Sequence, residues 1–78
     1  MYYDVVCSVY KESKNGTDYR IDSHLLCGGF ATDDDAMVYL NTHDFTEYDD
    51  TGKDDLYTCI EIEEHNEDGS VARVITVD

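Results

Sequence analysis

Residues 28–40 read GGFATDDDAMVYL and contain the one clear helix start in this chain. Thr32 is suited to cap a helix, because its side-chain oxygen can accept a hydrogen bond from an amide of the first turn. Asp35 stands three residues later, where a capping-box side chain reaches back toward the cap. The three aspartates of the first turn also favour the positive end of the helix dipole. The pattern therefore predicts a helix from Asp33 to about Thr42.

One stripe of this helix is apolar and is expected to face a sheet. Ala36 and Leu40 lie on the stripe at helical spacing, and either Met37 or Tyr39 extends it. Phe30 comes just before the cap and is expected to anchor the start of the helix in the core.

Upstream of the helix, the alternation of residues 3–10 has the period of a strand. Lys14-Asn15-Gly16 then supplies a turn, which we expect to be a three-residue loop with a left-handed Gly16. A second strand follows from about Tyr19 to Cys27, and Gly28-Gly29 is expected to end it.

The register of this first hairpin is chosen by its apolar pattern. The three-residue loop places Val9 opposite Ile21 and collects one apolar face, whereas a two-residue Asn15-Gly16 turn would place Val9 opposite Asp22. The preferred register also predicts three further pairs, which are Ser13 with Thr17, Val5 with Leu25 and Tyr3 with Cys27.

Downstream of the helix, the sequence predicts a second hairpin. Strands over Leu56–Glu64 and Val71–Val77 flank Asp68-Gly69, a strong signal for a two-residue turn. The register pairs apolar with apolar and acid with base: Ile62 with Ile75, Ile60 with Val77 and Glu64 with Arg73. The order ββαββ predicts an α+β fold in one domain, residues 1–78, with a four-stranded antiparallel sheet and one helix packed on one face.

The charge of the chain is strongly acidic. Nineteen Asp and Glu residues against five Lys and Arg residues give a formal net charge of −14. Residues 33–68 hold fourteen of the acids, with Lys53 as the only base. Solubility needs far fewer acids than this, so the excess favours a surface that binds a basic partner, although acids on a solvated face are the plain alternative. Direct binding of nucleic acid is disfavoured, because its phosphates would be repelled.

The expected contact surface combines the helix start, the long loop His43–Asp55 and an outward-facing strand face. Tyr48 and Tyr57 lie among these acids and could stack on arginine side chains. The candidate partner-binding residues are Asp33, Asp34, Asp35, Asp44, Glu47, Tyr48, Asp49, Asp50, Asp54, Asp55, Tyr57, Glu61 and Glu63.

No enzymatic or metal-binding motif is predicted. The cysteines, Cys7, Cys27 and Cys59, form no C-x-x-C pair, and the histidines have no local ligand spacing. A calcium loop starting at Glu47 fails, because its twelfth position is Thr58 instead of a glutamate. We therefore expect no catalytic residue, no metal and no cofactor. With no signal peptide and no apolar span visible, we expect a cytoplasmic protein with reduced thiols.

With its compact ββαββ order, its acidity and the segment Gly29–Leu40 leading into the helix, the chain resembles the small phage-encoded inhibitors called anti-CRISPR proteins. The resemblance rests on architecture and charge, so no functional residue is transferred by matching. It implies a viral protein in the host-cell cytoplasm, which mimics nucleic acid and blocks the DNA-binding site of a CRISPR effector.

Two other functions stay open. The chain could be a small structural protein with incidental acids, forming a homodimer through the uncovered face of its sheet or through an edge strand. It could also be a weak binder of divalent cations through its acid cluster.

Overall fold

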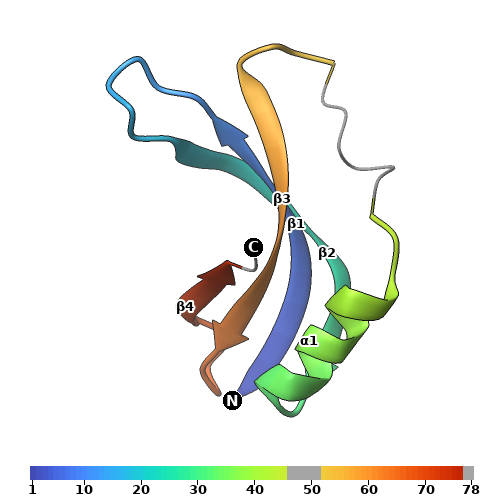
Figure 1. Ribbon diagram of the computed structural model, residues 1–78. Coiled ribbons are helices and arrows are strands. Elements are labelled where there is room, and N and C mark those ends of the chain that lie inside the picture. The colour runs from blue at the N-terminus through green and yellow to red at the C-terminus, as the bar shows by residue number, and fades with distance from the viewer. Residues whose placement is uncertain (46–51, 77–78) are drawn as a thin grey trace.

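The structure is a computed structural model that describes residues 1–45 and 52–76. Its elements are β1 (Tyr2–Lys11), β2 (Tyr19–Phe30), α1 (Asp33–Thr42), β3 (Leu56–His65) and β4 (Val71–Thr76). The four strands form one antiparallel sheet in the order β2-β1-β3-β4. The predicted ββαββ architecture is confirmed, and α1 packs on one face of the sheet (Figure 1).

The helix has the bounds that its sequence predicts. Thr32 caps it, with the Asp35 amide donating to Thr32 Oγ1 at 3.1 Å. Ala36 is fully buried, and Met37 and Tyr39 both pack against the core, so the apolar stripe includes both alternatives.

The core between α1 and the sheet is small. Its buried centre consists of Val5 from β1, Ala36 from α1 and Ile62 from β3. Partly buried side chains surround this centre: Tyr3, Leu26, Phe30, Met37, Tyr39, Leu40, Ile60 and Ile75. Phe30 therefore has the core position that the sequence predicts.

The first hairpin has the expected turn, and beside the turn it keeps the expected register, with Tyr10 opposite Arg20, but farther along the register differs. Gly16 has φ 78° and donates its amide to the Ser13 carbonyl at 3.1 Å, as the three-residue loop requires. Val9, however, pairs with Asp22 instead of Ile21, because a bulge adds one residue to β2 between Arg20 and Asp22.

Two further irregularities follow, so that Val5 pairs with Cys27 and Tyr3 with Phe30, where the sequence predicts Leu25 and Cys27. Apolar alternation does not reveal bulges of this kind, which depend on how the strand twists around its neighbour.

Gly28 and Gly29 do not end β2, as expected, but lie inside it. The Gly29 amide donates to Asp4 Oδ1 at 3.0 Å, and Gly29 has φ 81°. A Cβ on Gly28 would overlap the Asp4 carboxylate. Gly28 is therefore needed because the Asp4 side chain of β1 approaches its backbone, and Gly29 because its backbone is left-handed.

The second hairpin has the expected register, with Ile62 paired to Ile75 and Glu64 to Arg73. The predicted pair of Ile60 with Val77 lies outside the described residues. The two-residue turn is wrong. The loop has three residues, Glu67–Gly69, closed by hydrogen bonds from the Gly69 amide to the Asn66 carbonyl and from the Asn66 amide to the Ser70 carbonyl. Gly69 takes φ 90° at the bulge position of this turn type.

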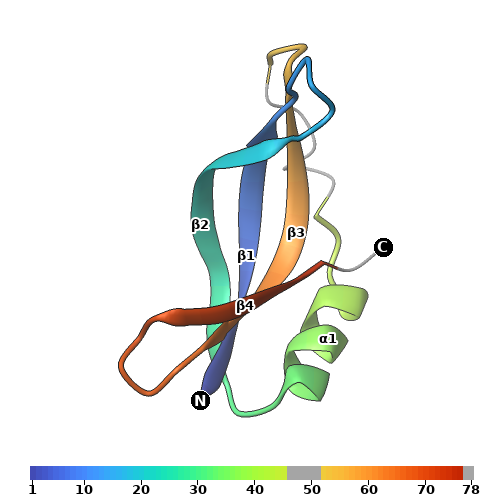
Figure 2. The same cartoon turned by 90° about the vertical axis from the view of Figure 1, so that its left-hand side faces the viewer.

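The sheet is strongly twisted. Figure 2 shows β4 crossing in front of the other strands, on the side of the sheet away from α1. The face of the sheet without the helix is therefore concave, and the strands around its centre shield the side chains there from solvent.

Candidate functional site

Six of the predicted acidic contacts are exposed: Asp33, Asp34, Asp35, Asp44, Asp54 and Asp55. The first three belong to the start of α1, Asp44 follows its end, and the last two lead into β3. The start of α1 and the segment entering β3 lie at opposite ends of the molecule (Figure 1), whose longest extent is 37 Å. The acids thus form a row along one side and not a compact patch. Glu47, Tyr48, Asp49 and Asp50 lie outside the described residues.

Tyr57 is half-buried, and its hydroxyl is already used within the molecule. It donates a hydrogen bond of 2.6 Å to Asp18 Oδ2, which raises the pKa of Tyr57 to about 12. Its ring stacks on Tyr10 with 5.6 Å between the centroids. Only the open side of the Tyr57 ring therefore remains for contact with a partner.

Glu61 and Glu63 do not lie on a solvated face, which corrects the prediction. Glu61 is 1% exposed and Glu63 is 9% exposed. Their alternation with Ile60 and Ile62 does direct them to the face opposite α1, but that face is curled, and Arg20 of β2 reaches across it to them. They belong to a buried ion-pair network and not to a contact surface.

Arg20 is the cation at the centre of this network. Its Nη1 lies 2.7 Å from Glu63 Oε2, its Nη2 lies 3.3 Å from Glu61 Oε1, and its Nε donates to Ser8 Oγ at 2.9 Å. A second bond joins Arg20 Nη2 to the same hydroxyl. Ser8 is fully buried, so water cannot reach its hydroxyl. The Arg20 guanidinium supplies the hydrogen-bond donors that this buried hydroxyl needs.

Neutral donors complete the environment of Glu61. The Tyr10 hydroxyl lies 2.8 and 2.9 Å from its two carboxylate oxygens, and the Thr76 hydroxyl of β4 donates to Oε2 at 3.0 Å. Burial opposes ionisation of Glu61, but the hydrogen bonds and the charge of Arg20 outweigh it and lower the pKa of Glu61. Burial and the bond to Glu61 raise the pKa of Tyr10.

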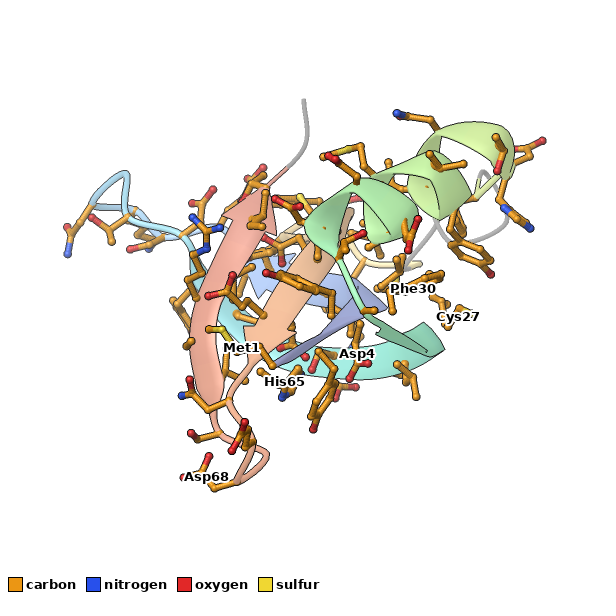
Figure 3. The ribbon with its side chains drawn as sticks, turned by 90° about the horizontal axis from the view of Figure 1, so that it is seen from below. Met1, Asp4, Cys27, Phe30, His65 and Asp68 are labelled. Atoms are coloured by element: carbon orange, nitrogen blue, oxygen red, sulfur yellow. The ribbon has the colours of Figure 1, made fainter. Side chains whose placement is uncertain are left out.

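A second branch of the network joins Asp4 to His65. His65 Nε2 lies 3.3 Å from Asp4 Oδ2 and 3.5 Å from Glu63 Oε1, while its Nδ1 lies 3.0 Å from the Gly69 carbonyl. The His65 ring stacks on Tyr2. Figure 3 shows Asp4 and His65 side by side, away from α1 and from Phe30 beneath it. This branch ties the end of β2 to the turn between β3 and β4.

Sequence reasoning missed Asp4, Ser8, Arg20 and His65 as members of one network. One signal was present: the alternate positions of β1 that face away from Val5 include Asp4, Ser8 and Tyr10, which are polar. Arg20 lies opposite Tyr10, as the predicted register implies, but the register alone does not show that its guanidinium reaches across the sheet to Glu61 and Glu63.

The described cations are mostly engaged with acids. Lys11 Nζ lies 3.8 Å from Asp55 Oδ2, and Arg73 Nε lies 3.2 Å from Glu64 Oε2. Arg20 serves the buried network. In the segment entering β3, Lys53 and Lys11 offset the charges of Asp54 and Asp55, so the excess of carboxylates on this side is concentrated at α1.

A hollow of about 240 Å³ lies where β2 meets the end of α1, which is below the roughly 300–1,000 Å³ usual for small-molecule sites. The side chains that line it are His24, Leu25, Leu26, Tyr39, His43, Asp44 and Phe45. The rings of Tyr39 and His43 stack at 3.9 Å, so their faces cover each other.

Within residues 1–45 and 52–76, no three His, Cys, Asp or Glu side chains are grouped so that they could hold a metal ion. No helix in the described part of the chain is long and apolar enough to cross a membrane. The three cysteines form no disulfide, and Cys7 is buried while the other two are half-buried.

Comparison with known proteins gives no relative: no family model, no curated protein and no solved structure matches the chain.

Proposed function

We propose that the protein binds a basic nucleic-acid-binding protein and occupies its nucleic-acid site. The observation that carries the proposal is the row of exposed acids along the side with α1: Asp33, Asp34, Asp35, Asp44, Asp54 and Asp55. Proteins that bind nucleic acid do so through Lys and Arg side chains. A row of carboxylates offers these side chains negative charges, as the phosphates of nucleic acid do.

The dimensions of the molecule support this function. Its long axis of 37 Å is close to one turn of B-DNA, roughly 34–36 Å. Acids at both ends of this axis can therefore meet basic side chains spread over a groove of that length. The buried Glu61 and Glu63 have no direct part in the contact and instead hold the sheet together.

A CRISPR effector belongs to this target class, and it is the target that the resemblance to anti-CRISPR proteins suggests. Binding would be non-enzymatic. Long-range attraction between an acidic protein and a basic groove speeds association, and salt weakens it.

The test compares two double variants of equal charge change. The surface variant carries Asp33→Asn and Asp54→Asn, and the control variant carries Glu67→Gln and Asp68→Asn, which are also exposed. Asp68 lies at the tip of the turn between β3 and β4, far from α1 (Figure 3).

Each protein is immobilised, exposed to host-cell lysate and eluted with a salt gradient. We expect the parent and the control variant to retain one nucleic-acid-binding protein that the surface variant releases at lower salt. The parent chain should also displace labelled DNA or RNA from that protein after purification. Retention that is equal for both variants, or capture without displacement of nucleic acid, would overturn the proposal.

A further inference from the structure

The edge strand β2 has the features of an interface. It has 12 residues, and among the described strands it pairs only with β1. Apolar side chains along it are exposed, at 51% for Tyr19, 48% for Ile21 and 61% for Leu25. Natural sheets protect their edges with short strands, Lys or Pro. The other edge, β4, has only six residues, whereas β2 is twice as long and contains no Lys and no Pro.

The charge of β2 suits a second copy of this chain. Its twelve residues contain one base, Arg20, and one acid, Asp22, although the whole chain has a net charge of −14. Like-charged chains are therefore not repelled at this edge. At physiological salt the Debye length is about 8 Å, which screens the acids farther away.

The sequence of β2 is self-complementary about Ser23. Two antiparallel copies related by a two-fold axis through Ser23 place Ile21 opposite Leu25 of the other copy and Asp22 opposite His24. A two-fold axis through Asp22 would set two aspartates against each other, and an axis through His24 would set Leu26 against Asp22. The register about Ser23 is the one that pairs apolar with apolar and an acid with a histidine.

The backbone of β2 is regular at the centre of this register, because Asp22–Leu25 pair with β1 without interruption. Bulges flank this segment on either side, and Ile21 is the extra residue of the first bulge. Ser23 is exposed, and its amide donates to its neighbour's carboxylate, Asp22 Oδ1, at 2.9 Å. In a pair of strands, the carboxylate can turn to His24 and leave the amide to the other backbone.

We infer that the protein forms a homodimer through β2, in which two sheets join edge to edge into one sheet of eight strands. The two-fold axis stands perpendicular to the sheet, so both α1 helices lie on the same face. The acidic rows then face the same side, and the dimer presents two of them to a partner.

The first experiment is sedimentation equilibrium of the full chain over a wide concentration range at about 0.15 M salt. We expect the mass to rise with concentration from 8.9 kDa toward twice that value. Leu25→Lys should raise the dissociation constant at least about tenfold. Val38→Lys is the matched control, because Val38 is also 61% exposed but lies on α1. A mass of one chain at every concentration, or equal effects of the two variants, overturns the inference.

The second experiment tests the register. In antiparallel pairs, opposite Cα atoms lie about 4.5–5.5 Å apart, within the range that a disulfide can span. Ser23→Cys should therefore cross-link two chains under mild oxidation, faster than the parent chain with its own cysteines. Asn15→Cys, at the tip of the first hairpin, should cross-link no faster than the parent. Equal rates for the two variants would contradict the axis through Ser23.

Discussion

Replacing Arg20 with methionine removes the cation from the buried network while keeping an unbranched, apolar side chain. The substitution leaves Glu61 and Glu63, at 1% and 9% exposure, without the guanidinium that lies 3.3 and 2.7 Å from them. Ser8 also loses its donors from Arg20. The variant therefore retains two shielded carboxylates with no nearby arginine.

Breaking a fully buried ion pair by removing one partner costs about 3–5 kcal/mol. The Arg20 side chain is 25% exposed, so solvent screening reduces this figure, and we expect a loss of about 2–4 kcal/mol. A domain of this size has a free energy of unfolding of roughly 4–12 kcal/mol. Since 1 kcal/mol shifts Tm by about 4–8 °C in small domains, Tm should fall by about 8–32 °C.

Urea unfolding followed by circular dichroism, with linear extrapolation, measures the loss. Lys11→Met is the control, because both side chains of the ion pair between Lys11 and Asp55 are exposed, at 44% and 56%. Exposed pairs contribute at most about 1 kcal/mol. If the Arg20 and Lys11 variants lose the same free energy, the buried network does not stabilise the fold.

A second substitution separates the charge from the packing. With Arg20 present, Glu63→Gln should destabilise the protein, because it weakens the contact of 2.7 Å. In the Arg20→Met background, Glu63→Gln should instead restore at least about 1 kcal/mol, because it removes an unpaired charge. An equal loss in both backgrounds would refute electrostatic coupling between the two residues.

Three further predictions concern a helix cap and two ionisable groups. Thr32→Ala removes the side-chain oxygen that accepts a hydrogen bond from the Asp35 amide. Urea unfolding should show that the free energy of unfolding falls by about 1 kcal/mol, and an unchanged value would mean that the cap is dispensable. The folded state lowers the pKa of Glu61 below its ordinary 4.5. The stability that ionised Glu61 contributes is therefore present above pH 4.5 and is lost as the pH falls through the folded pKa. Glu61→Gln should flatten the acid limb of a curve of Tm against pH, and an unchanged limb would contradict the lowered pKa of Glu61. The hydrogen bond to Asp18 and the charge of Asp18 raise the pKa of Tyr57 to about 12, and Asp18→Asn weakens the first and removes the second. Ultraviolet titration should then show one tyrosine ionising nearer to 10 than in the parent chain, and an unchanged titration would contradict the hydrogen bond.

Local patterns predict much of this fold because the interactions that form each element are local. The helix start depends on Thr32 and the amides that follow it, and the second hairpin depends on two strands whose side chains match across a short loop. The register of the first hairpin is wrong beyond Arg20, because bulges depend on how the strand twists around its neighbour and not on adjacent residues. Arg20 itself stands in the predicted register, but its contacts with Glu61 and Glu63 join residues about forty positions apart in sequence.

By itself, the sequence determined the order ββαββ, the bounds of α1, the pairing of Ile62 with Ile75 and the concentration of acids after residue 32. These follow from periodicity, capping and charge, which adjacent residues determine. Only the tertiary structure decided which acids meet solvent. Alternation places Glu61 and Glu63 on the face opposite α1, but the curl of β4 and the reach of Arg20 bury them there. Burial depends on what covers a side chain, and residues distant in sequence supply that cover.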